Sequence, residues 1–333
     1  MPFVGTSIEL LTAPNPVLDL KRQPRGAVTS NYHYENIKSN QILPWRDFSF
    51  QNIKAAYGHL FELGPFTSDA LDVKGSPARV ERESDIDNIT FGWCQQICRL
   101  PIKAGAERTQ RILGLETIDV SIRQQGMTSQ DSGSDGAKKK PDWSVFLNNG
   151  SDKRTLLVWG ENKCSSKWSS DRTQCPDENW IWPWRQLLTY CANSNVRYGF
   201  LLTPEELVVV RVYRVGTDPE TRWWLQYKSI PWADRGRNMM TVNLAIWSLT
   251  MMSVNEGHRF IQSPEWTLPL TVWWVDVDRR GVATYEHHLS GYTTSSKPSN
   301  ADIRKRPTRI PIPTPILAAE SSNKRRRTAR QSS

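Results

Sequence analysis

The sequence predicts an α/β fold in which one mixed β-sheet is flanked by helices. Segments with helical periodicity and short apolar runs follow one another in the order helix, strand, strand, strand, helix, strand, strand, helix. Hydrophobic residues make up 38% of the 333 residues and aromatic residues 10%, which is enough for a sizeable core. We find no internal repeat, so we expect a single main domain at residues 71–292.

The first helices are expected on either side of a turn-rich connector. Residues 1–70 are rich in Pro, Asn and Ser, and we expect them to be largely irregular. The exception is FQNIKAAYGHLFEL, residues 50–63, whose apolar residues share one face of a short helix. Residues 78–100 predict a longer helix, because apolar residues recur at steps of three and four and acids precede Arg99.

The strands of the sheet should come next. LETIDVSIRQQG, residues 115–126, alternates as a strand does, and a polar Gly/Ser-rich loop follows it. Two apolar runs, 142–148 and 155–163, predict a hairpin joined by the loop 149–154. The remaining predicted elements are a helix at 182–195, two strands within 196–215, a helix at 240–254, a hairpin within 270–289 and a disordered basic tail at 293–333.

The net charge of +9 belongs almost entirely to that tail. Ten basic and two acidic residues lie between Lys297 and Ser333, which gives this segment +8 and the other 296 residues +1. A near-neutral body is weak evidence for a nucleic-acid surface. The tight basic clusters instead predict nuclear localisation through an import receptor, or non-specific phosphate contacts. The expected import signal comprises Lys324, Arg325, Arg326 and Arg327.

Other classes of protein are not favoured. No apolar run approaches the ~18 residues of a membrane span, and the first residues lack the pattern of a signal peptide. Five cysteines, an odd number, favour reduced thiols inside a cell. The sequence has no phosphate-cradling glycine-rich loop with lysine and no Gly-x-Ser-x-Gly nucleophile elbow.

Three charged residues stand out at the open end of the predicted hairpin. With the loop 149–154, Asp142 faces Glu161, and Lys163 lies on the same sheet face. A tight turn at Asn149-Gly150 would place Asp142 opposite Leu157, and Glu161 would then be four residues away on that face. Both registers give a shared face, but only the first brings the two carboxylates together.

Two opposed carboxylates repel each other unless a cation lies between them. All-oxygen ligation favours Mg²⁺, or Mn²⁺, over zinc. Such an ion activates water and stabilises charge during phosphodiester hydrolysis, and a nearby lysine can orient the water. The spacing alone is equally compatible with a solvated cluster of charges on the surface.

A family resemblance favours the first interpretation. Pro141-Asp142 and, after eighteen intervening residues, Glu161-Asn162-Lys163 resemble the PD-(D/E)XK signature of the restriction-endonuclease-like nuclease superfamily. Glu83 occupies the place of an acid on the preceding helix, although Glu81, Asp85 and Asp87 compete for this role. Gln186 and Tyr190 are similar to the Gln-x-x-x-Tyr motif of the exonuclease-like branch. The span 78–254 resembles the fungal PD-(D/E)XK nuclease-like proteins.

This resemblance implies an α-β-β-β-α-β core and Mg²⁺-dependent cleavage of nucleic acid, and we expect DNA in preference to RNA. Asp142 and Glu161 would bind the metal, Lys163 would position water, and Gln186 and Tyr190 would support the site. The alternative is an inactive nuclease-like fold that acts as a nuclear nucleic-acid-binding or protein-interaction module.

Further contacts to nucleic acid are expected near the site. Lys138, Lys139 and Lys140 precede Asp142 and are candidates for phosphate contacts. Trp182 and Trp184 lie beside a polar loop and are candidates for stacking on bases. Packing in the core is the competing interpretation for the tryptophans.

Overall fold

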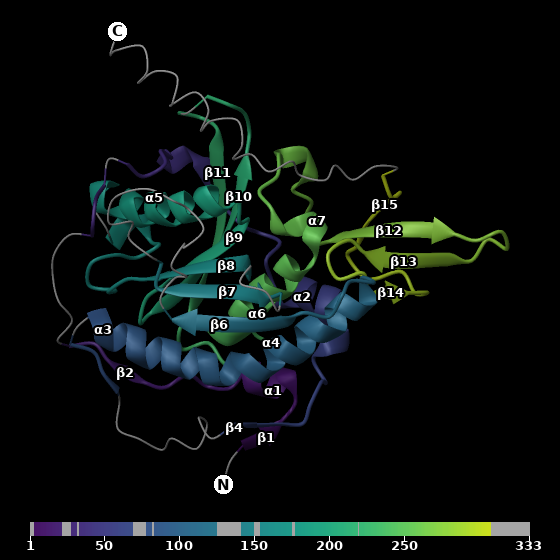
Figure 1. Cartoon of the computed structure of the whole chain (residues 1–333), viewed down its shortest axis with the longest axis horizontal. Coiled ribbons are helices and arrows are strands. Elements are labelled where there is room, and N and C mark those ends of the chain that lie inside the picture. Colours follow the sequence, from purple (N-terminus) through teal and green to yellow (C-terminus); the bar gives the residue numbers. More distant parts are fainter. Residues whose placement is uncertain are drawn as a thin grey trace.

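The computed structural model describes residues 3–21, 28–31, 33–68, 78–81, 83–124, 141–149, 154–174, 177–218 and 220–307. Its centre is a seven-stranded mixed sheet in the order β3-β11-β10-β9-β8-β7-β6 (Figure 1). The pairs β8–β9 and β11–β3 are parallel and the others are antiparallel. The strands are β3 (Ile42–Pro44), β6 (Asp119–Gln124), β7 (Trp143–Asn148), β8 (Arg154–Asn162), β9 (Tyr198–Leu202), β10 (Glu206–Arg214) and β11 (Trp223–Pro231).

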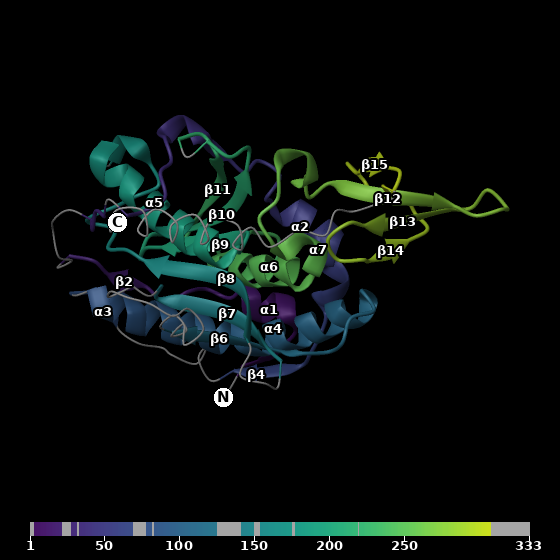
Figure 2. The ribbon, with the colours of Figure 1, turned by 45° about the horizontal axis from the view of Figure 1, so that its top comes forward.

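Helices cover the sheet on both faces, which confirms the predicted α/β class (Figures 1 and 2). On one face α4 (Gly92–Ile112) and α6 (Val242–Val254) pack against each other and the sheet, and on the other α5 (Asp177–Ser194) packs on β8 and β9. Each face has its own apolar core, because strands buried on both sides are apolar throughout. Within the described residues no helix is long and apolar enough to cross a membrane.

Two helices are longer than predicted, and each contains a proline. The helix predicted at 78–100 begins as α3 (Glu83–Ile86), passes through a π-helical turn, and continues as α4 through Pro101 to Ile112. Packing of its later turns against α6 and β6 outweighs the cost of a proline within the helix. Helix α5 begins at Asp177 rather than 182, so Pro183 lies inside it and not in its first turn.

The β7–β8 hairpin has the wide-loop register at its open end. Trp143 pairs with Gly160 and Val145 with Val158, which extends to Asp142 facing Glu161. A β-bulge after Val145 shifts the register by one residue toward the loop, so Asn148 pairs with Arg154 rather than Thr155. The tight-turn register is therefore wrong, and the pairing that brings the carboxylates together is present.

The N-terminal region is more ordered than predicted. The predicted short helix is present as α2 (Phe50–Tyr57), and β3 adds a strand to the edge of the main sheet. Trp45 and Phe48, which follow β3, are buried in the main core, so the segment 45–61 is part of the main body. The other elements here are β1 (Phe3–Gly5), α1 (Ser7–Leu11), β2 (Leu18–Asp19), β4 (Phe66–Ser68) and, beyond residue 70, β5 (Ala78–Arg79).

A second, four-stranded sheet projects from the body (Figures 1 and 2). The predicted hairpin within 270–289 is present as β12 and β13. The tail expected to be disordered from residue 293 supplies two further strands, so that boundary is wrong, because these residues pair with the hairpin. The sheet consists of β12 (Val272–Val277), β13 (Ala283–His287), β14 (Thr293–Thr294) and β15 (Asp302–Arg304), and the short helix α7 (Glu256–Arg259) precedes it. Lys324, Arg325, Arg326 and Arg327 lie outside the described residues.

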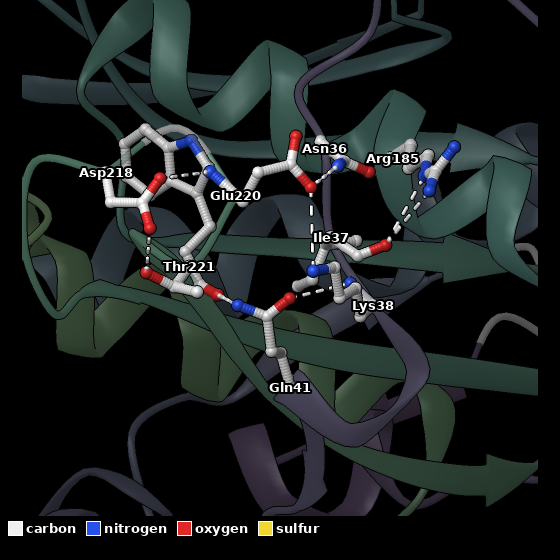
Figure 3. A network of polar contacts seen from close by, with 9 residues as sticks. Asn36, Ile37, Lys38, Gln41, Arg185, Asp218, Glu220 and Thr221 are labelled. Atoms are coloured by element: carbon white, nitrogen blue, oxygen red, sulfur yellow. Dashed lines mark hydrogen bonds and ion pairs between the residues drawn. The ribbon is translucent and has the colours of Figure 1, made fainter.

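A polar network ties the segment before β3 to the main body (Figure 3). The Asn36 side chain donates to Glu220 at 2.9 Å, and the Arg185 guanidinium on α5 donates to the carbonyl oxygen of Ile37 at 3.3 Å. Gln41 donates to the carbonyl oxygen of Trp223 at 3.0 Å. These contacts hold residues 36–41 between α5 and the β10–β11 loop, and thereby place the preceding residues beside the site described next.

Candidate active site

The charged residues of the hairpin converge with α5 at one point. The Lys163 ammonium lies 2.7 Å from Oε1 of Glu161, and the Gln186 amide donates to the same oxygen at 2.5 Å. Gln186 also contacts the hydroxyl of Tyr190 at 2.9 Å, as its spacing of four on α5 predicts. Oδ2 of Asp142 accepts from the backbone N–H of Asn162 at 2.8 Å. Five residues predicted from the sequence are thus brought together.

The middle residue of the Glu-x-Lys motif points to the opposite face of the sheet. The Asn162 side chain accepts from the Trp143 indole at 2.9 Å and donates to the carboxylate of Asp87. Asp87 lies in the π-helical turn before α4 and raises the pKa of Asp142 by its negative charge. Among the acids proposed on this helix, Asp87 is therefore linked to the site through Asn162. Glu83 begins α3, and the position of its side chain lies outside the description.

Burial gives the site unusual electrostatics. Only 5% of Glu161 and 7% of Lys163 are exposed. Burial raises the pKa of Glu161, and the neighbouring Lys163 partly offsets this effect. Burial and the adjacent Glu161 raise the pKa of Asp142 to about 7. The hydrogen bond from the Asn162 backbone N–H has the opposite effect and lowers this pKa. The two carboxylates therefore lie close enough for each charge to disfavour the other, as two acids at a shared site do.

Buried polar atoms without a partner indicate where a ligand would bind. Among the residues that the structure describes, Oε2 of Glu161 and Oε1 of Gln186 are buried and have no hydrogen-bond partner, although the backbone N–H of Asp142 also acts on Glu161 and lowers its pKa. Buried oxygens are almost always paired, so an unpaired carboxylate oxygen at a functional site calls for an explanation. A cation held between Oε2 of Glu161 and the Asp142 carboxylate would provide one.

Asp142 and Glu161 fit Mg²⁺ or Mn²⁺, which take some ligands from water and substrate, rather than a metal whose ligands all come from the protein. The part of the chain that the structure describes contains no group of three or more His, Cys, Asp or Glu side chains that could hold a metal ion. Mg²⁺ is commonly held by one or two carboxylates, with waters and substrate phosphates as its other ligands. Asp142 and Glu161 meet this requirement, and the fit rests on their chemistry and on the unpaired Oε2.

Tyr34 is a component of the site that sequence reasoning missed. Among the described residues its hydroxyl is buried and has no hydrogen-bond partner, and its pKa is raised by burial and by the charge of Glu161. Tyr190, whose pKa is raised mainly by burial, also responds to the charges of Glu161 and Tyr34. Tyr34 precedes residues 36–41, the segment that the network in Figure 3 anchors, and no spacing or motif in the sequence relates it to the hairpin.

The loop after Lys163 is held beside the site by Glu206 at the start of β10. Its carboxylate accepts from the backbone N–H of Ser170 at 2.7 Å and from that residue's hydroxyl at 2.6 Å. Ser169 and Ser229 also donate to it. One buried edge of the loop is therefore fixed by a single carboxylate.

The residues predicted to contact nucleic acid differ in burial, and some lie outside the described part of the chain. Trp184 is fully buried among Trp168, Trp180 and Tyr227, so the prediction that it stacks on bases is wrong because its ring belongs to the core. Trp182 is half-buried and lies against the Arg185 guanidinium, 5.0 Å from the ring centroid. Lys138, Lys139 and Lys140 lie outside the described residues.

No family model, curated protein or solved structure matches this chain. The functional assignment therefore rests on the residues and geometry described above.

Proposed function

We propose that this protein is a metal-dependent nuclease that hydrolyses phosphodiester bonds in nucleic acid, DNA rather than RNA. The observation that carries the proposal is the convergence of Asp142, Glu161 and Lys163 with Gln186, next to an unpaired oxygen of Glu161. The order α4, β6, β7, β8, α5, β9 supports a restriction-endonuclease-like core, with the parallel pair β8–β9 joined through α5.

Each residue of the site would have its own role in hydrolysis. Asp142 and Oε2 of Glu161 would hold Mg²⁺ or Mn²⁺, which when bound supplies water activation and neutralises charge on the phosphate. The Lys163 ammonium, fixed by Oε1 of Glu161, would orient the attacking water and stabilise charge on the phosphoryl oxygens. Gln186 and Tyr190 are positioning residues, because they act through Glu161. Water adds to phosphorus as the bond to the leaving oxygen breaks.

The direct test is cleavage of supercoiled plasmid and of single-stranded DNA and RNA with Mg²⁺ or Mn²⁺. Wild type should cut, and Lys163→Ala and Asp142→Ala should lower the rate by at least ~100-fold. Lys228→Ala, which removes an exposed lysine on β11, is the matched control and should cut like wild type. Full activity of Lys163→Ala in a folded protein would refute the site assignment.

An inactive nuclease-like fold, acting as a nuclear binding or interaction module, is the second candidate. The near-neutral body favours it, because nucleases commonly present a basic groove. In that case wild type would bind its partner without cutting. Binding would then be unchanged by chelators and by Glu161→Gln.

We also propose nuclear localisation through an import receptor that recognises Lys324, Arg325, Arg326 and Arg327. A fluorescent fusion should accumulate in nuclei, and replacement of these four residues by alanine should abolish the accumulation. Equal distribution of the two fusions would contradict this proposal.

A further inference from the structure

Two arginines converge on the sheet face that carries the candidate site. The guanidinium carbons of Arg123 on β6 and Arg154 on β8 lie 5.1 Å and 5.2 Å from the centroid of the Phe146 ring on β7. Both arginines are exposed, whereas Phe146 is fully buried beneath them. We call these three residues the arginine clasp.

The strand register places the clasp on the same sheet face as Asp142 and Glu161. Arg123 is opposite Ser144, and Arg154 is opposite Asn148. Because side chains alternate along a strand, Ser144, Phe146 and Asn148 share one face of β7, and Asp142 precedes them at the same period. Phe146 is four positions along the strand from Asp142, a distance of about 13 Å. The clasp and the carboxylates therefore lie on the same face of the sheet.

The positive charges of the clasp are not neutralised by the described protein residues. Neither Arg123 nor Arg154 forms an ion pair with any residue that the structure describes. The acid that lies nearest along β6, Asp119, pairs instead with Lys103 at 3.4 Å. Two like charges over one ring repel each other, and the electron-rich ring face offsets this only in part. An anion bound between the guanidiniums would remove the conflict.

We propose that the arginine clasp binds the sugar–phosphate backbone of the nucleic-acid strand that enters the candidate site. This inference rests on the proposed function and specifies its substrate-binding surface. The planar guanidinium groups can contact phosphate oxygens in pairs, and the Phe146 ring holds their orientation. Contacts to the backbone carry no sequence information, so the clasp positions a strand without selecting its bases. It also provides local positive charge on a body whose net charge is near zero.

The test is nucleic-acid binding without metal, so that cleavage does not enter. We would measure fluorescence anisotropy of labelled single-stranded and duplex DNA, with a chelator present, at several salt concentrations. The variant is Arg123→Gln/Arg154→Gln, which keeps the length that covers Phe146 and removes both charges. Arg123→Lys/Arg154→Lys retains the charges. Arg279→Gln/Arg280→Gln, at the exposed tip of the β12–β13 hairpin, is the control with the same change in charge.

The glutamine variant should bind roughly two- to fivefold more weakly per arginine removed, as expected for exposed ion pairs. Its slope of log affinity against log salt should also become shallower by about 0.7–0.9 per arginine. The lysine variant should retain most of the affinity, and the hairpin control should match wild type. Equal weakening by the clasp and control variants would overturn the proposal, as would unchanged binding by the clasp variant.

These results are separable from the proposed catalysis. Weaker binding by the clasp variant, with no cutting by wild type under any metal condition, would support the clasp and reject the nuclease. Cutting by wild type with normal binding and cutting by the clasp variant would support the nuclease and reject the clasp. An acidic peptide that competes with DNA only when the clasp is intact would show that the surface is not specific for nucleic acid, which also overturns the proposal.

Discussion

Replacing Asp142 with asparagine should stabilise the metal-free protein, by an amount that grows with pH. The pKa of Asp142 rises from its ordinary value of 3.8 to about 7, first because of burial and then because of Glu161. Between these two values the folded protein keeps a proton that the unfolded chain has lost. The free energy of unfolding of wild type therefore falls as pH rises through this window. Asparagine has nearly the same shape and can still accept from Asn162.

The size of the effect follows from the pKa difference. Each pH unit corresponds to about 1.4 kcal/mol, so the full difference is about 4 kcal/mol. Because the Asp142 side chain keeps some contact with solvent, we expect about 2–4 kcal/mol above pH 7. Near pH 4 the difference between variant and wild type should be small, and it should level off above pH 8.

Urea denaturation followed by tryptophan fluorescence, with a chelator present, measures this difference at each pH. Asp276→Asn, on the exposed end of β12, is the matched control. A stabilisation of Asp142→Asn that does not change with pH would refute the reasoning, and so would a loss of stability. Adding Mg²⁺ should then stabilise wild type more above pH 7 than below pH 6, because the metal binds the ionised carboxylates. The Asp142→Asn variant should lose most of this response.

Three further predictions concern the frame around the site. Gly160→Ala should lower the free energy of unfolding by about 1–3 kcal/mol, since a Cβ there would lie 2.3 Å from the Phe200 ring; an unchanged melting temperature would contradict this. Glu206→Ala should cost about 1.5–3 kcal/mol, because it leaves the Ser170 donors of the loop after Lys163 unpaired; faster proteolysis of that loop would confirm it and wild-type resistance would oppose it. Trp184→Ala should cost about 3–5 kcal/mol and Trp182→Ala much less; equal stabilities with weaker DNA binding would instead restore the stacking role of Trp184.

The parts of the site that could be predicted from the sequence are those set by local periodicity. Alternation along two strands placed Asp142, Glu161 and Lys163 on one face, and helical spacing placed Gln186 beside Tyr190. Each of these relations spans one hairpin or one helical turn. The structure adds the bulge after Val145, which changes only the half of the hairpin that lies away from the site.

The parts that could not be predicted depend on contacts between segments that are far apart in the sequence. Tyr34 reaches the site because residues 36–41 bind α5 and the β10–β11 loop, and no short pattern encodes that docking. Asp87 is linked to the site by a π-helical turn and by Asn162, neither of which is visible as a periodicity. Helix α4 passes through Pro101 because α6 packs against its later turns, so tertiary packing overrides the local signal.

The balance of charge around Asp142 distinguishes a metal site from a structural ion pair. The neighbours that influence its ionisation are Glu161 and Asp87, which oppose it, and Lys163, which favours it. Asp87 accepts from the Asn162 side chain on the other face of the sheet, so the acids next to Lys163 are Asp142 and Glu161. If both were ionised, one ammonium would face two carboxylates in a largely buried site. The protein can relieve this by keeping a proton on Asp142, as its raised pKa indicates, or by binding a divalent cation there, as proposed above. A structural ion pair needs a single acid, so the second acid beside Lys163 is the feature that the proposed cation site would explain.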